Sequence, residues 1–210
     1  MPLRSVIFDF GIVLTGTPLQ HEHDAMVRLT GLTPQQFEPL YWADRHAYDE
    51  GKLTGITFWQ KFLADAAIPA TPALVEQLNA HDARMWTTEN PRMLAWQLAL
   101  AQRGLKTAIL SNMGDAVLAS IESAFPWLSR FDVLVWSYQL GIAKPDPAIY
   151  LHTLEKLGTA PAETLFIDDK LVNVHAAQAL GIQAIEYTTV ENLRTQLTAL
   201  GLADQIPLPA

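Results

Sequence analysis

The chain has 210 residues, half of them hydrophobic and 17% charged, so a packed core is expected and disorder is not. A formal net charge of −8 without a basic run argues against nucleic acid as a partner, because neutralising phosphates requires clustered Lys and Arg. The sequence lacks cysteine, a leader-like apolar start and any apolar run near the ~20 residues of a membrane span. We therefore expect a cytoplasmic protein without thiolate metal sites or membrane contacts.

The first predicted element is a buried strand at the start of VIFDFGIVLT, residues 6–15. Three apolar residues lead directly to Asp9, which the strand would deliver to the edge of a sheet. Two positions later the chain has Gly11, a residue without a side chain. The pair raises the question of why a carboxylate is placed there and followed so closely by a glycine.

The next stretch, residues 17–88, has helical character throughout and contains no clear strand candidate. Its segments are MVRLTGL, PQQFEPLYWADRHAYDEG, TGITFWQKFLADAAI and TPALVEQLNAHDARMW. We predict a helical cap of residues 17–88, inserted after the first strand into a core formed by residues 1–16 and 89–210. The aromatic residues Trp42, Tyr48, Trp59 and Trp86 are expected to be buried inside this insert rather than to line a pocket.

From residue 105 onward, apolar strand-like runs alternate with helical patterns. The predicted strands are 105–112, 131–137, 164–169 and 182–187, and the predicted helices between them are 114–125, 146–158 and 173–181. This alternation is typical of α/β proteins with a Rossmann-like parallel sheet. The last eight residues, ADQIPLPA, are expected to form a loose tail.

Polar residues follow most of the predicted strands. They are Asp9, Ser111, Asn112, Lys144 in the loop before a helix, Asp168, Asp169 and Asn173. Parallel sheets bind ligands at the carboxyl ends of their strands, so these residues are expected to meet at one edge. There a carboxylate can act as a nucleophile, a hydroxyl can bind an anion, and a lysine can neutralise charge. Clustered carboxylates also suit Mg²⁺.

The order of these motifs resembles the haloacid dehalogenase-like hydrolase superfamily. FDFGIVLT is similar to its first motif, ILSN to its second, the lysine of GIAKPDP to its third and FIDDKLVN to its fourth. The segment EGKLTGITFW, residues 50–59, is similar to a cap segment of the phosphatase-type subgroup. That subgroup includes sugar-1-phosphate phosphatases and the N-terminal domains of epoxide hydrolases.

The resemblance implies a phosphatase that needs Mg²⁺ as its cofactor. Asp9 would attack the phosphoryl group and carry it as an aspartyl phosphate. Mg²⁺ would be held by Asp9, the backbone carbonyl of Gly11 and Asp169, and Asp168 and Asn173 would support the metal site. The electrostatics agree, because two carboxylates and a phosphate dianion facing a single lysine require a divalent cation.

The resemblance also assigns the substrate-binding residues. Ser111, with Asn112 and the nearby backbone amides, would bind the phosphoryl oxygens. Lys144 would offset the charge on the nucleophile and on the phosphate, so Ser111 and Lys144 count as catalytic together with the nucleophile. The implied partner is a small phosphorylated metabolite.

Gly11 departs from the family pattern, in which most phosphatases have a second aspartate two residues after the nucleophile. That aspartate protonates the leaving group and then activates water, a contribution typically of ~10²–10⁴-fold. Two alternatives remain open. The substrate has a good leaving group, such as an anomeric sugar phosphate or an acyl phosphate, or the cap supplies the acid, with His46, Asp49 and Glu50 as candidates.

Two other functions compete with the phosphatase. A 2-haloacid dehalogenase would have an aromatic residue two positions after the nucleophile and an arginine soon after it, but this chain has Gly11 and no arginine in residues 10–25. A catalytically weak binding module of the same fold would explain the glycine. It would not explain why the other motif residues are intact.

Overall fold

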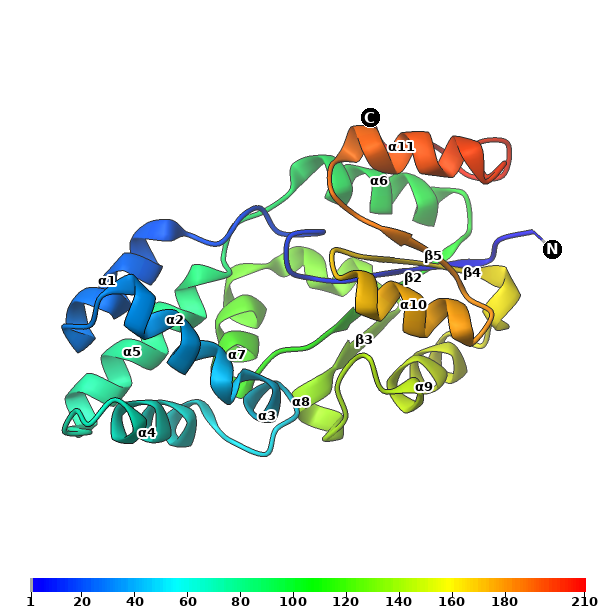
Figure 1. The fold of residues 1–210 in the computed structure, drawn as a ribbon. Coiled ribbons are helices and arrows are strands. Elements are labelled where there is room, and N and C mark those ends of the chain that lie inside the picture. Colours follow the sequence, from blue (N-terminus) through cyan, green and yellow to red (C-terminus); the bar gives the residue numbers. More distant parts are fainter. Residues whose placement is uncertain (1) are drawn as a thin grey trace.

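The computed structural model describes residues 2–210 and contains a five-stranded parallel sheet (Figure 1). The strand order is β3-β2-β1-β4-β5. The strands are β1 (Ser5–Phe8), β2 (Lys106–Ser111), β3 (Val133–Trp136), β4 (Thr164–Asp168) and β5 (Gln183–Glu186). The predicted Rossmann-like parallel sheet is therefore confirmed.

Strand β1 lies in the middle of the sheet, between β2 and β4. Its last residue, Phe8, is aligned with Ile109 of β2 and Ile167 of β4. The pairing continues one residue further, because the amide of Asp9 donates to the carbonyl of Ile167 at 2.8 Å. Asp9 thus follows the central strand at the carboxyl edge of the sheet, where open parallel sheets bind their ligands.

Helices cover both faces of the sheet (Figure 1). On one face lie α6 (Pro91–Gln102) and α11 (Val190–Ala199), and on the other lie α9 (Pro147–Leu157) and α10 (Leu171–Ala179). Each pair buries an apolar stripe against the strands, and the two stripes form separate core clusters. Four further helical elements complete this part of the chain: α7 (Asp115–Ala124), η1 (Pro126–Arg130), α8 (Ser137–Leu140) and η2 (Pro161–Glu163).

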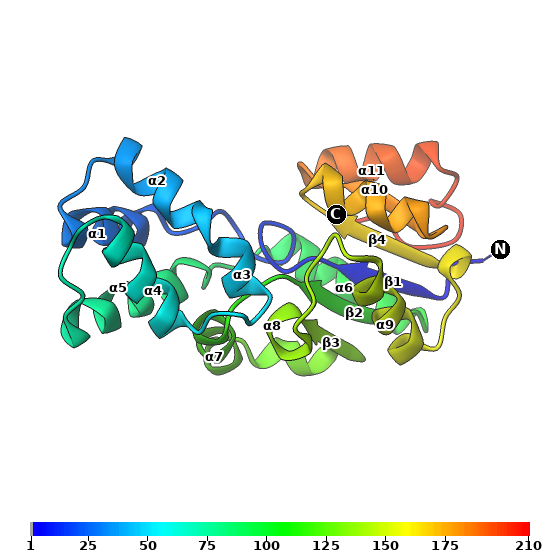
Figure 2. The same cartoon turned by 60° about the horizontal axis from the view of Figure 1, so that its bottom comes forward.

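Five helices lie between β1 and α6 in the chain, beyond the carboxyl ends of the strands (Figures 1 and 2). They are α1 (Gln20–Thr30), α2 (Pro34–Ala43), α3 (Arg45–Asp49), α4 (Gly55–Asp65) and α5 (Pro72–Met85). They pack around an aromatic core of their own, in which Tyr48 and Trp59 are fully buried as predicted.

The helical region contacts the sheet region at three points on α3 and at the start of α4. The ring of Tyr48 covers Gly114 so closely that a Cβ on this glycine would lie 2.0 Å from the ring. The carboxylate of Asp115 accepts a hydrogen bond from the amide of Gly55 at 2.8 Å. Ser137 donates to the carbonyl of Asp49 at 2.5 Å. These contacts hold the five helices over the edge of the sheet.

The C-terminal residues do not form the loose tail that the sequence predicts. The indole of Trp96 donates to the carbonyl of Pro207 at 2.6 Å, and Arg194 donates to the carbonyl of Pro209 at 2.5 Å. Ile206 is buried against the cluster under α6 and α11. The segment therefore closes one face of the sheet. Within residues 2–210, no helix combines the length and apolarity needed to cross a bilayer.

Candidate active site

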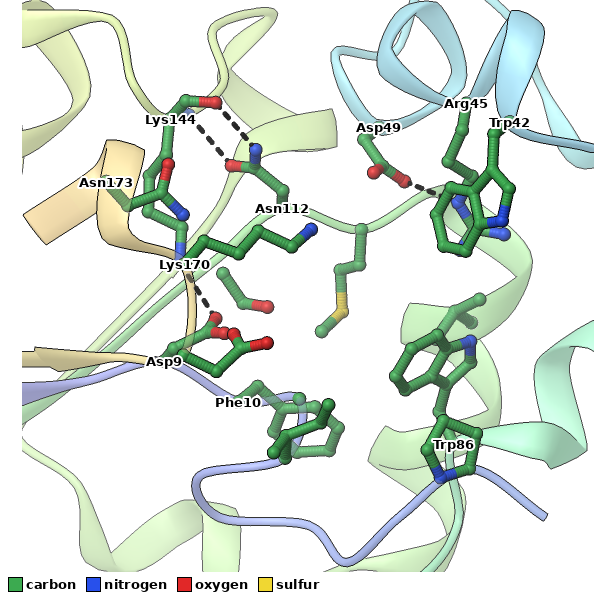
Figure 3. Close-up of a pocket in the computed structure, with 17 residues that line it drawn as sticks. Asp9, Phe10, Trp42, Arg45, Asp49, Trp86, Asn112, Lys144, Lys170 and Asn173 are labelled. Carbon is green, nitrogen blue, oxygen red and sulfur yellow. Dashed lines mark hydrogen bonds and ion pairs between the residues drawn. The ribbon is translucent and has the colours of Figure 1, made fainter. Parts of the chain in front are cut away.

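Three carboxylates meet at the carboxyl edge of β1 and β4. Oxygen atoms of Asp9, Asp168 and Asp169 lie within 4.8 Å of one another. Asp9 follows the central strand, and the other two end the neighbouring strand and begin the loop after it. Asp9 and Asp169 line a cavity of about 260 Å³ between the sheet and the five helices (Figure 3).

Lys144 is buried between two of these carboxylates. Its Nζ donates to Oδ1 of Asp9 at 2.8 Å and to Oδ2 of Asp168 at 2.6 Å. A third bond, of 2.9 Å, goes to the carbonyl of Leu110. With all three ammonium hydrogens engaged and only 3% of the residue exposed, Lys144 is held as a fixed positive charge beside the nucleophile candidate.

The cluster shifts the acidity of its members. Burial raises the pKa of Asp9 from 3.8 to about 7, because the charged form loses water. Lys144 opposes this rise in pKa, while the charges of Asp168 and Asp169 increase it. Burial alone lowers the pKa of Lys144, but its two carboxylate partners outweigh burial and raise it. The site thus holds more negative charge than Lys144 balances.

Asp168 has little capacity left for a ligand. One oxygen accepts from Lys144, and the other accepts from the amide of Lys170 at 2.8 Å. The side-chain amide of Asn173 donates to both oxygens, at 3.0 and 3.1 Å. The carboxylate is fully buried and does not line the cavity. It orients Lys144 and the loop after β4, so we expect Asp9 and Asp169 to be the carboxylates that face a cation.

Ser111 ends β2, Asn112 follows it, and both residues line the cavity. The side chain of Asn112 is committed to the loop that carries Lys144 (Figure 3). Its Nδ2 donates to the carbonyl of Lys144 and its Oδ1 accepts from the amide of Lys144, both at 2.8 Å. Asn112 therefore positions Lys144, whereas no hydrogen bond among the described residues engages the Ser111 hydroxyl.

Gly11 lies directly beneath an aromatic ring. A Cβ placed on Gly11 would lie 3.4 Å from Cζ3 of Trp86, which closes α5 and lines the cavity. The carbonyl of Gly11 accepts from the amide of Val13 at 2.6 Å, which leaves one lone pair for a cation. The Cβ of an aspartate at this position would therefore touch the indole at van der Waals distance.

The carboxylates and the Gly11 carbonyl are hard oxygen ligands, and their excess negative charge suits a divalent cation.

We predict that Mg²⁺ stabilises the protein more at about pH 8 than at about pH 5, because ionised carboxylates bind it. Without metal, the raised pKa means that Asp9 contributes stability below pH 3.8 that is lost as pH rises through about 7. Melting temperatures with and without Mg²⁺ across this range test the prediction. An Asp9→Asn control should lose most of the pH dependence. An equal effect of Mg²⁺ on the melting temperature of the wild type at both pH values would contradict the prediction.

The outer wall of the cavity comes mainly from the five helices and is largely apolar. Pro18, Trp42 and Trp86 line it from this region, opposite Met113 and Val117 of the sheet region. Trp42 is 52% exposed, so the prediction that it is buried in the helical region is wrong. Its indole N–H reaches Glu38 on the same helix, and the ring turns toward the cavity instead of the core (Figure 3).

Arg45 provides the one positive charge on this wall and was not predicted from the sequence. Its guanidinium bonds both oxygens of Asp82 at 3.1 Å, contacts the Tyr41 hydroxyl, and donates through Nε to Asp49 at 3.1 Å. Lys170 also lines the cavity and was missed, although it directly follows the two aspartates of the fourth motif. Tyr41 and Asp49 lie four residues from Arg45, but the pairing with Asp82, 37 residues away, has no sequence signal.

The three residues of the helical region that were considered as acids lie in different environments. The side chain of His46 is 64% exposed, and that of Glu50 pairs with His46 and Lys52. Neither lines the cavity. Asp49 does, on the side opposite Asp9, with Lys170 extending into the space between them (Figure 3).

A comparison with known families decides the identity of this arrangement. Residues 4–181 match the model of the haloacid dehalogenase-like hydrolase family. The chain belongs to this family. In this haloacid dehalogenase-like hydrolase, Asp9 follows β1, Asp168 ends β4, and Lys144 reaches both carboxylates from the loop before α9.

Relatives of this hydrolase include named phosphatases. It is 26% identical to a D-ribitol-5-phosphate phosphatase from Bacteroides thetaiotaomicron, over 94% of this chain and 98% of that protein. It is 43% identical to a sesquiterpene phosphatase from Aspergillus oryzae, over 46% of this chain and 50% of that protein. The chain thus spans about half the length of the latter, and its match to mouse acyl-CoA dehydrogenase family member 10 spans 11% of that protein.

A solved structure shares the fold. The haloacid dehalogenase-family enzyme bt-2542 from Bacteroides thetaiotaomicron, crystallised with magnesium and inorganic phosphate, is 23% identical to this hydrolase. The superposition has a TM-score of 0.73 and covers 89% of this chain and 94% of that one.

Proposed function

We propose that this hydrolase is a Mg²⁺-dependent phosphatase that forms an aspartyl phosphate on Asp9. The observation that carries the proposal is the position of Asp9, which lines the cavity beside Asp169 while Lys144 holds its Oδ1. The named phosphatase relatives and the metal-and-phosphate complex of the structural neighbour support it. Asp9, Asp169 and the carbonyl of Gly11 would hold Mg²⁺, which when bound supplies charge neutralisation at the phosphoryl group.

The protein's own residues bind and orient the phosphoryl group. The free oxygen of Asp9 attacks phosphorus while Lys144, bonded to the other oxygen, fixes the carboxylate and offsets its charge. Ser111 offers a hydroxyl to a phosphoryl oxygen at the end of β2. Residues 17–88 would act as the cap that covers the substrate, over a core of residues 1–16 and 89–210.

The outer wall favours a substrate with an apolar leaving group. Around the bound phosphate, the leaving group would contact the rings of Trp42 and Trp86 and the side chain of Met113. Arg45 is already compensated by Asp49 and Asp82, so the outer wall itself offers no free cation to a second acidic group on the substrate, and Lys170 reaches the cavity from the loop after β4 instead. A sugar would find few partners for its hydroxyls here, which revises the expectation of a sugar phosphate.

A substrate panel tests both parts of the proposal. The purified protein is assayed against aryl and alkyl phosphates, sugar phosphates and acyl phosphates, with and without Mg²⁺. We expect turnover only with the metal, and a kcat/KM at least about 10-fold higher for apolar leaving groups than for sugars. Burying about 60 Å² of apolar surface contributes about 1.5 kcal/mol, which is about tenfold.

The same panel separates the competing functions. Absence of turnover on every phosphate, with Mg²⁺ still raising the melting temperature, would favour a binding module. Chloride release from 2-haloacids without metal would favour a dehalogenase. A preference for sugar phosphates would leave the phosphatase standing and overturn the assignment of an apolar leaving group.

A further inference from the structure

We propose that Asp49, on the helical region, is the general acid and base that replaces the aspartate missing at position 11. This inference rests on the proposed phosphatase function and deepens it. It follows from the space above Gly11, the placement of Asp49 in the cavity, and the contacts that hold Asp49 in position.

The usual position for the acid carries no side chain in this protein. The residue there is Gly11, and the indole of Trp86 lies beside it at van der Waals distance. The loop after β1 offers no other carboxylate for this role, because residues 10–15 contain no acidic residue. Any proton donor to the leaving group must therefore come from another side of the cavity.

Asp49 is the one carboxylate of helices α1–α5, all of which the structure describes, that lines this cavity. It ends α3 and faces the cavity from the side opposite the nucleophile (Figure 3). An acid that protonates the leaving oxygen must lie opposite the attacking carboxylate, because attack and departure at phosphorus occur roughly in line. Asp49 meets that requirement, whereas the exposed His46 and the paired Glu50 do not line the cavity.

The position of Asp49 is fixed by both its side chain and its backbone. Arg45 holds the carboxylate oxygen Oδ1 at 3.1 Å and is itself anchored by Asp82. The carbonyl of Asp49 accepts from Ser137, whose hydroxyl oxygen accepts from the amide of Met113 at 3.0 Å. This chain of bonds links Asp49 to the loop that follows Ser111 at the end of β2. The second carboxylate oxygen is left for the substrate.

The charges around Asp49 suit a group that both donates and accepts a proton. Burial raises its pKa, Arg45 opposes the rise, and the buried Asp82 adds to it. Lys170, from the loop after β4, weakly lowers it. The outcome is a pKa above the ordinary value, so the acid form is more populated near neutral pH than for an exposed aspartate.

The proton balance then closes over two steps. Asp9 forms a bond to phosphorus, the bond to the leaving oxygen breaks with its electron pair, and that oxygen takes the proton of Asp49. In the second step, the carboxylate of Asp49 takes a proton from water, whose oxygen attacks phosphorus and releases Asp9. The sum is hydrolysis of one phosphate ester by one water, with Asp49 protonated again.

Leaving-group dependence tests this assignment. Asp49→Asn is compared with wild type on hexyl phosphate, a poor leaving group, and on p-nitrophenyl phosphate, a good one, both with Mg²⁺. We expect kcat for hexyl phosphate to fall about 10²–10⁴-fold. With p-nitrophenyl phosphate we expect a burst near one equivalent of nitrophenolate, followed by slow turnover and a phosphorylated Asp9 visible by mass spectrometry. Water attack on the phosphoenzyme lacks its base in this variant.

Glu50→Gln is the matched control, since it changes the adjacent carboxylate that does not line the cavity. It should retain wild-type kinetics on both substrates. If Asp49→Asn is unstable, Asp49→Ala with added formate replaces it, and formate should restore turnover of hexyl phosphate. The role of Asp49 would be overturned if Asp49→Asn turned over both substrates as fast as Glu50→Gln does. It would also be overturned if formate failed to restore the turnover of hexyl phosphate by Asp49→Ala. Silence of the wild type itself would instead overturn the proposed function.

Discussion

Asp9→Asn is expected to abolish turnover of every phosphate ester that the wild-type protein hydrolyses, with a loss of about 10⁴-fold or more. The carboxamide oxygen is a poor nucleophile. No other carboxylate that lines the cavity is bonded to Lys144 as Oδ1 of Asp9 is. Initial rates at saturating Mg²⁺ and mass spectrometry of the phosphoenzyme measure the effect. No phosphorylated protein should form, even with p-nitrophenyl phosphate.

Asp169→Asn distinguishes loss of the nucleophile from loss of a metal ligand. Both carboxylates line the cavity, but only Asp9 is bonded to Lys144. We expect Asp169→Asn to raise the Mg²⁺ concentration needed for half-maximal activity, with part of the turnover recovered at high Mg²⁺. Recovery of Asp9→Asn by Mg²⁺, or more than a tenth of wild-type activity in that variant, would contradict the nucleophile assignment.

Lys144→Met is expected to lower the free energy of unfolding by about 3–5 kcal/mol as well as to remove activity. Lys144 is almost fully buried between Asp9 and Asp168, so its loss leaves two buried carboxylates without their cation. The destabilisation should shrink as pH falls, because protonation neutralises the carboxylates. Urea unfolding at about pH 5 and about pH 8 measures both effects.

Two further variants identify the cause of that loss. Lys106→Met removes an exposed lysine at the opposite end of β2, which donates to the carbonyl of Leu157, and should cost about 1 kcal/mol. Lys144→Met combined with Asp168→Asn should recover part of the stability but none of the activity. Equal destabilisation by the two lysine variants would show that the buried charge pair is not the cause.

The inner half of the site could be predicted because each of its residues follows a local pattern. Asp9, Ser111 and Asp168 each end an apolar strand, and a parallel sheet brings such ends to one edge whatever the details of packing. The proline and aspartate at the start of α9 likewise mark where the loop of Lys144 ends. Short-range sequence pattern and topology were sufficient there.

The outer half could not be predicted, because it depends on contacts between residues far apart in the chain. Arg45 is held by Asp82, and Trp86 rests over Gly11, and neither pairing has a periodic signature. The polarity and prolines of ADQIPLPA suggested a tail, yet the backbone carbonyl of Pro207 satisfies the indole of Trp96. Backbone groups carry no side-chain signal, so the sequence pattern does not reveal such a contact.

The contact between Gly11 and Trp86 also determines how variants of this site should be built. Aspartate at position 11 alone would place its Cβ in van der Waals contact with the indole, and a small residue at position 86 alone would open a void beside Gly11. The effects of the two substitutions are therefore non-additive, although 74 residues separate the positions in the chain. A mutational scan that changes one position at a time misses this coupling. A library that varies residues 11 and 86 together samples an acid on the loop after β1 with the neighbouring ring that suits it.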